Sequence, residues 1–259
     1  KRHLVVHRNI RMNERDSINP FDTQLGCRFP TAPELAFLRN FVTLIVTDFD
    51  EETAGGPIPN LVSNVIDEMY DRRSDKREAN LYHTGVLAEV DETLTKHQIV
   101  VDDKTTWWEI VDELIKCDEF VVAGHAQRLA VPLLADAVTA VNSEKIANAY
   151  GDIRDGNTNE FLIKSFSRKI SDALGFFPIL ARPTAFDLGD ARVAALDLNE
   201  VSQGGGAIGD RITAVMYMLA RQVLAKDFYM TEDVIHDMPA PPHITLRDTV
   251  PTEKIKEYH

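Results

Sequence analysis

Apolar residues recur every three or four positions over most of the chain, the spacing that places them on one face of a helix. The clearest stretches are 35–45, 58–69, 161–174 and 212–224, and the region 86–141 reads as almost wholly helical. The pattern therefore predicts a mostly helical protein.

Local signals mark where several of these helices begin and end. Thr31 and Glu34, and again Thr106 and Glu109, have the spacing of a capping box, in which side chains at a helix start bond the free backbone N–H groups. Pro132 lacks a backbone N–H and predicts a break just before it.

The two tryptophans of the chain are adjacent, at the start of a predicted helix. Trp107 belongs to an apolar stripe with Ile110, Val111 and Leu114. Neighbouring residues on a helix point about 100° apart, because 3.6 residues make one turn. We therefore expect one tryptophan to be buried and the other to face a partner or a second helix.

Two segments read as strands and two as loops. The run LVV at 4–6 predicts a short strand, and RVAALDL at 192–198 is the best candidate for a buried strand. Glycine, proline and small polar residues at 51–59 and 151–159 predict loops.

Together these elements predict a helical middle flanked by pieces that each carry one strand. We expect residues 1–56 to belong to an α/β core, 57–175 to form a helical insertion subdomain, and 176–259 to return to the core and end in an extended segment. Insertions of this kind enter a domain at surface loops whose ends lie close together.

The composition and net charge of the chain argue against some classes of function. The chain of 259 residues has a net charge of −13, which makes a poor nucleic-acid surface, so we expect no nucleic-acid partner. No apolar stretch is long enough to cross a membrane. Two cysteines, Cys27 and Cys117, without a Cys-x-x-Cys motif fit free thiols in a reducing compartment. The chain starts KRHLVVHR without Met, and we expect a fragment of a longer protein.

The loop EVSQGGGAIGDRIT at 200–213 resembles a phosphate-binding loop in spacing alone. Gly204 and Gly209 have the four-residue gap of such a loop, but Asp210 and Arg211 stand where Lys and Ser or Thr are needed. A carboxylate in the lysine position repels phosphate. We favour a flexible strand-to-helix connection.

Acidic residues suggest two metal sites, each with a simpler alternative. Asp197 ends an apolar strand, as in a Walker B motif, but many parallel strands end in Asp and Leu198 replaces the second acid. Asp48, Asp50 and Glu51 read more readily as an acidic helix end. We assign no metal ligands.

Three arginines could reach the nucleotide of a neighbouring subunit, namely Arg128, Arg192 and Arg211. The alternative for each is a salt-bridged or solvated side chain, which we favour. No nucleophile motif is present, so we assign no catalytic residue; Asp197, Arg192 and Arg211 are the candidates for cofactor binding.

Several longer strings resemble the traffic ATPases of type IV secretion and conjugation systems, most closely those of the Dot/Icm type IVB branch. The resemblance covers about residues 4–230, and no single motif decides it. It is carried by NPFDTQLG (19–26), WWEIVDELI (107–115), AQRLAVPLLAD (126–136), FFPILARPTAFDLGDARVAALDLNEV (176–201) and GDRITAVMYMLAR (209–221).

This resemblance implies an α/β core of the RecA/HerA-like P-loop type, interrupted by a large helical insertion. It implies homo-hexamers at the cytoplasmic face of the bacterial inner membrane, working with other secretion ATPases and inner-membrane components. It places Walker A before residue 1 and Walker B after residue 259. ATP and Mg²⁺ would bind the full-length protein, and we expect neither to bind this chain tightly.

Two other functions stay open. The helical middle could be a non-catalytic interaction module that recruits another ATPase or a coupling protein, which an exposed tryptophan and the acidic surface would favour. An unrelated acidic enzyme that uses Asp197 and a metal is the third hypothesis.

Overall fold

The computed structural model describes residues 5–47, 56–156, 158–186, 193–198 and 205–225. These residues form two compact units, each assembled from separate parts of the chain. The first unit takes its described residues from 1–20, 36–67 and 133–226, and the second takes them from 21–35 and 68–132.

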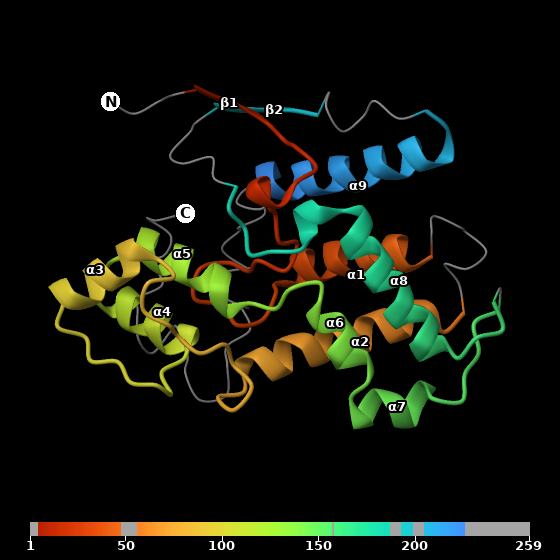
Figure 1. Ribbon diagram of the computed structural model, residues 1–259, viewed down its shortest axis with the longest axis horizontal. Coiled ribbons are helices and arrows are strands. Elements are labelled where there is room, and N and C mark those ends of the chain that lie inside the picture. The colour runs from red at the N-terminus through yellow and green to blue at the C-terminus, as the bar shows by residue number, and fades with distance from the viewer. Residues whose placement is uncertain (1–4, 48–55, 157, 187–192, 199–204, 226–259) are drawn as a thin grey trace. The chain divides into compact units, whose positions relative to one another are not determined.

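The first unit contains a two-stranded parallel sheet (Figure 1). Strand β1 (Val5–Asn9) pairs with β2 (Val193–Asp197) along their full length, with Val5 opposite Val193 and Asn9 opposite Asp197. Both predicted strands are thus confirmed. The pairing joins segments from the two ends of the described chain, because parallel strands need a long connection between them.

The prediction that 192–198 forms a buried strand is wrong for the described residues. Val193 is 56% exposed and Ala195 is also exposed. Parallel sheets are normally covered on both faces. In the part of the chain that the structure describes, β2 has one ladder partner, so an apolar sequence alone does not bury it.

Helix α9 (Gly206–Ala225) follows β2, as the strand-to-helix reading of the glycine loop predicted. Gly206 has φ +78, a left-handed backbone conformation that residues with a side chain rarely adopt. Residues 200–204 of the loop lie outside the described residues. Asp210 and Arg211 fall within the helix rather than in a loop.

Short and medium helices make up the rest of the first unit. Residues of α1 (Ala32–Val46) and α2 (Ile58–Ser74) belong partly to this unit and partly to the second. The others are the 3₁₀ turns η1 (Glu14–Asp16) and η2 (Pro178–Leu180), and helices α6 (Asp136–Val141), α7 (Glu144–Tyr150) and α8 (Leu162–Phe176).

Backbone and hydroxyl hydrogen bonds join the early and late segments of this unit. The N–H of Ile18 donates to the carbonyl of Ile179 at 2.9 Å. The hydroxyl of Ser17 donates to the carbonyl of Pro183 at 2.6 Å. The N–H of Asn19 donates to Thr184 Oγ1 at 2.7 Å. Residues 17–19 therefore run beside 179–184 and extend the connection that β1 and β2 begin.

The second unit is built on α3 (Ala88–Lys96), α4 (Trp107–Lys116) and α5 (Phe120–Ala130). Helix α5 packs against both α3 and α4. The capping box of Thr106 and Glu109 is present in full, and α5 ends just before Val131 and Pro132, as predicted. At Thr31, the N–H donates to the carboxylate of Glu34 at 2.7 Å.

Both tryptophans are buried, so of the two settings expected for the second ring, facing a partner or facing a second helix, the first is wrong. Trp107 is 4% exposed and Trp108 is 3% exposed. The ring of Trp107 meets Tyr82 edge-on at 5.0 Å, and the guanidinium of Arg28 lies over Trp108 at 4.8 Å. Residues distant in sequence thus cover the second face of α4.

The mostly helical character predicted from the apolar spacing is confirmed, with the parallel sheet as its only described β-structure beyond two isolated bridges. The division at residues 56 and 175 stays a prediction. The two observed units interleave along the chain: 21–35 joins 68–132 in one, and 133–175 joins the strands in the other.

The buried tryptophans give a direct test of the second unit. Because the chain has two tryptophans, its indole fluorescence reports on α4 alone. We expect blue-shifted emission and poor quenching by acrylamide in the native protein, for Trp107→Phe and Trp108→Phe alike, since buried rings are shielded from the quencher. Quenching as efficient as in urea for either single-tryptophan variant would contradict this packing.

Candidate functional site

The described residues place polar side chains at two locations that matter for function. One is the carboxyl end of the parallel sheet, where ligands bind in many α/β proteins. The other is a loop in the second unit, residues 21–28, which contacts α4 and α5. The sequence pointed to the first location; the structure adds the second.

At the sheet, Asp197 is the last residue of β2 and is half-buried. Its carbonyl accepts a hydrogen bond from the N–H of Ile10 at 3.0 Å, which continues the pairing past the end of β1. Within the described residues, no group of three or more His, Cys, Asp and Glu side chains is arranged to hold a metal ion. The observed backbone contact of Asp197 is structural.

Arg211 lies on α9, where its Nη2 donates to the carbonyl of Ile45 at 3.2 Å. Ile45 belongs to the last turn of α1, where carbonyls lack partners within the helix and attract positive charge. The guanidinium also lies 6.0 Å from the ring centre of Phe176. These contacts make Arg211 a cap for α1, and they do not test whether it could reach a neighbouring subunit's nucleotide.

The remaining candidates from the sequence lie outside the described residues or belong to a different unit. Arg192 lies outside the described residues, as do Asp48, Asp50 and Glu51. Arg128 is half-buried on α5, in the second unit, whereas Asp197 and Arg211 belong to the first.

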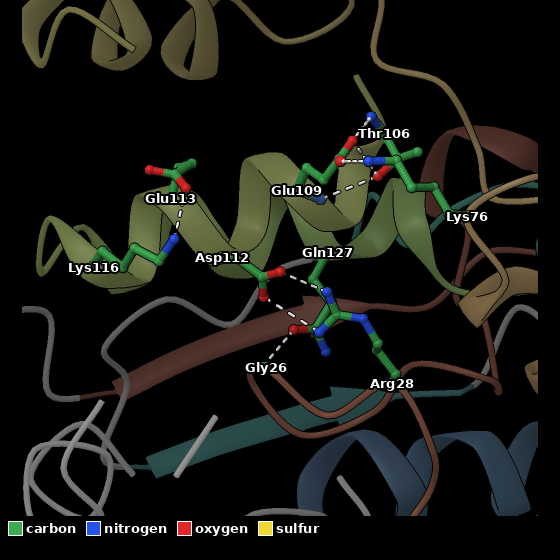
Figure 2. Close-up of polar contacts among 9 residues, drawn as sticks. All are labelled: Gly26, Arg28, Lys76, Thr106, Glu109, Asp112, Glu113, Lys116 and Gln127. Atoms are coloured by element: carbon green, nitrogen blue, oxygen red, sulfur yellow. Dashed lines mark hydrogen bonds and ion pairs between the residues drawn. The ribbon is translucent and has the colours of Figure 1, made fainter. Parts of the chain in front are cut away.

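The central feature of the second location is a buried ion pair between Arg28 and Asp112 (Figure 2). Arg28 Nη2 donates to Asp112 Oδ2 at 2.6 Å and Nη1 donates to Oδ1 at 3.2 Å, a two-pronged geometry. The two side chains are 2% and 7% exposed. Burial raises the pKa of Asp112, and the Arg28 guanidinium counteracts that rise.

Gln127 of α5 provides a second attachment for the same loop. Its Oε1 accepts from the N–H of Gly26 at 2.6 Å, and its Nε2 donates to the carbonyls of Thr23 and Gln24 at 3.1 and 2.9 Å. The N–H and C=O groups of a loop are not paired by a helix or a strand ladder, so they need other hydrogen-bond partners. One buried amide side chain therefore replaces the hydrogen bonds that regular structure would supply.

Two other ionisable groups of this region are buried and neutral. Burial, assisted by Glu34, raises the pKa of the Cys27 thiol to about 12, although Arg28 acts against the rise. The thiolate is the reactive form of cysteine, so Cys27 is inert near neutral pH. Burial also raises the pKa of Tyr70, whose hydroxyl donates to the carbonyl of Phe21 at 2.8 Å.

The other ion pairs of α4 are at the surface (Figure 2). Lys76 pairs with Glu109 and Lys116 pairs with Glu113, at 2.6 and 2.7 Å, and each of these four side chains is at least one third exposed. Exposed pairs of this kind contribute at most about 1 kcal/mol.

Sequence reasoning missed Asp112 and Gln127. Asp112 is four residues after Trp108, which places both on one face of α4 beside the apolar stripe. Arg28 stands between Cys27 and Phe29, an unusual setting for a solvated arginine. These positions indicate a buried arginine and a buried aspartate, but nothing in the sequence shows that residue 28 pairs with residue 112.

No family model, curated protein or solved structure matches the chain. Among the described helices, none has both the length and the apolar character needed to cross a bilayer. What the described residues show at this site is the attachment of the 21–28 loop to α4 through Arg28 and to α5 through Gln127.

The buried pair predicts a large and specific loss of stability on mutation. We expect Asp112→Ala to lower the free energy of unfolding by about 3–5 kcal/mol, because Arg28 is left charged and buried. Lys116→Ala, which breaks a surface pair on the same helix, should cost less than about 1 kcal/mol. Urea unfolding followed by far-UV circular dichroism measures both.

The double variant Arg28→Met/Asp112→Leu separates the pair from general packing. It should be more stable than Asp112→Ala, because neither charge remains buried without its partner. If the losses of Arg28→Met and Asp112→Leu measured separately add up to the loss of the double variant, these residues are not coupled.

Proposed function

We propose that the chain is a segment of a hexameric traffic ATPase that energises type IVB protein secretion, of the IcmB (DotO) type in Dot/Icm systems. The hexamer would work at the cytoplasmic face of the bacterial inner membrane. Within it, this chain supplies scaffold and interaction surface, and ATP and Mg²⁺ bind elsewhere in the full-length protein.

The observation that carries this proposal is the parallel pairing of β1 with β2. The two strands come from opposite ends of the described chain, and helices occupy the sequence between them. A RecA/HerA-like core with a helical insertion, which the resemblance implies, requires such an arrangement. The strand–glycine loop–helix order of β2 and α9 is also what that core would have.

The resembling strings also coincide with the contacts of the second unit. The string at 19–26 includes most of the loop that Gln127 binds, and Gln127 itself lies in the string at 126–136. Asp112, the partner of Arg28, lies in the string at 107–115. Strings separated in the chain therefore meet in one buried network, which supports a shared structural role for them.

The described chemistry favours a scaffold over a catalytic part. Phosphate binding needs backbone N–H groups and a lysine, and hydrolysis needs a bound Mg²⁺. Asp210 and Arg211 stand where lysine and its hydroxyl neighbour would be, and Arg211 contacts α1. Under this proposal Asp197 belongs to a core strand and has no metal to bind.

A second candidate is a helical module that recruits another ATPase or a coupling protein. The argument from an exposed tryptophan is lost, because both rings are buried. Large apolar side chains are nevertheless exposed in the second unit: Val86 is 51% exposed, Val100 is 93% and Val121 is 55%. Apolar side chains mark a contact surface for a protein partner when they lie together in a patch, and this candidate requires that of the three valines.

Nucleotide measurements test the first proposal. We expect calorimetry to detect no tight binding of Mg-ATP to this chain, since no phosphate cradle is present among the described residues. The full-length protein that contains it should hydrolyse ATP and form hexamers, and Asp112→Ala should weaken both, whereas Lys116→Ala should not. Tight Mg-ATP binding by the chain, or a full-length protein without ATPase activity, would overturn the proposal.

Capture experiments test the second. With the whole chain as bait, we expect Val100→Asp and Val121→Asp to abolish capture of another secretion ATPase, because a buried carboxylate at the interface is costly. Lys104→Gln, on the same loop as Val100, changes the net charge by the same −1 and serves as the matched control. Capture unchanged by both valine substitutions would exclude these side chains as the contact surface.

A further inference from the structure

Apolar side chains gather on the outside of the second unit where α3 ends and α5 begins, two helices that are in contact (Figure 1). Glu119, the residue before α5, lies 2.8 Å from Nε2 of His97, the residue after α3. Five apolar residues follow these two in the chain, and we call them the corner patch: Ile99, Val100, Val101, Phe120 and Val121.

The corner patch is anchored from below and exposed above. Ile99, Val101 and Phe120 pack with part of their surface against the buried cluster of α3, α4 and α5, which fixes their positions. Val100 is 93% exposed between two of these anchored residues, and Val121, next to the third, is 55% exposed. The two valines therefore continue an apolar surface rather than standing alone among polar residues.

The surroundings of the corner patch are strongly negative. Residues 89–122, from α3 to the start of α5, contain ten acidic and three basic residues, a net charge of −7 out of −13 for the whole chain. Glu92, Asp102 and Asp103 are exposed carboxylates of this stretch. Hydrogen bonds from the N–H of Lys104 and the hydroxyl of Thr105 hold the pKa of Asp102 below its usual range.

This charge selects among the partners that an apolar surface attracts. A second copy of the chain would bring two acidic surfaces together, and like charges that face each other across an interface are unfavourable. Anionic lipid and nucleic acid are repelled for the same reason. A basic polypeptide is attracted instead, and the acidic surroundings also steer its approach.

The elements of the corner patch favour a helix over a strand as the bound segment. Strand addition needs the free edge of a sheet, whereas the corner patch presents the side chains of a loop and of a helix start. An amphipathic helix offers apolar side chains every three or four residues, with polar ones on either side.

We propose that the corner patch binds a basic amphipathic helix of a partner protein. Its apolar face covers Val100 and Val121, and its lysines and arginines face Glu92 and Asp103. This inference rests on the second candidate function, recruitment of another protein, and it specifies the chemistry of the segment that is recruited.

A synthetic peptide of leucine and lysine, arranged as an amphipathic helix and labelled with fluorescein, tests the apolar contact by anisotropy with the whole chain. We expect binding, and we expect Val100→Ser/Val121→Ser to raise the Kd at least about tenfold, because two apolar contacts are lost. Val193→Ser is the matched control, since Val193 is a 56% exposed valine of the first unit. It should leave the Kd unchanged.

Neutral substitutions test the charge contact. Glu92→Gln/Asp103→Asn should weaken binding roughly threefold at low salt, and the difference should shrink at high salt, because exposed charges are screened. Glu144→Gln/Asp152→Asn removes the same amount of charge from two exposed positions of the first unit. It should weaken binding less, because these carboxylates are not beside the corner patch.

Three outcomes would overturn the proposal. The first is equal binding of a scrambled peptide of the same composition, and the second is wild-type affinity in the double valine variant. The third is a dimer in sedimentation that the double valine variant loses, which would assign the corner patch to a second copy.

The result also separates this inference from the candidate function on which it rests. Peptide binding that depends on the valines, without capture of another secretion ATPase, would refute that function and leave the inference in place. Capture that depends on the valines, without peptide binding, would refute the inference alone.

Discussion

The second unit depends on keeping one irregular loop against two helices without leaving a buried charge or a backbone group unbonded. The Arg28–Asp112 pair and the Gln127 amide do this together. Removing both charges of a buried pair is often neutral, whereas removing one is costly. We infer that the pair contributes to specificity, because Gly26 meets Gln127 in the same register of the loop in which Arg28 meets Asp112.

In the first unit, too, contacts between distant segments hold the structure together. They are hydrogen bonds rather than a buried ion pair, and they join residues about 160 or more positions apart. Hydrogen bonds from Ser17 and Ile18 reach residues 183 and 179, and β1 continues that contact to β2. Arg211 adds a charged cap at the end of α1. Each unit is complete only when distant parts of the chain are in contact. Closing the loops between those parts costs conformational entropy, which the contacts must offset.

Elements whose signal is local could be predicted from the sequence. The Thr106–Glu109 capping box, the helix end before Pro132 and the order of strand, glycine loop and helix are each encoded within a few residues. Burial is different. Trp108 is covered by Arg28 and Val193 is exposed, and both outcomes depend on segments far away in the chain. A helical or strand pattern shows which face is apolar but not what meets it.

Strongly shifted pKa values often mark active sites, but ion pairs and burial in a scaffold shift them too. Here each shifted buried group has a structural explanation. Asp112 bonds Arg28, Tyr70 donates to the carbonyl of Phe21, and the Cys27 thiol is neutral because it is desolvated. An active site would need such groups to converge on a space that a substrate can enter. In the second unit they hold the 21–28 loop and helix α4 in place, and this structural role accounts for their shifted pKa values without a bound substrate.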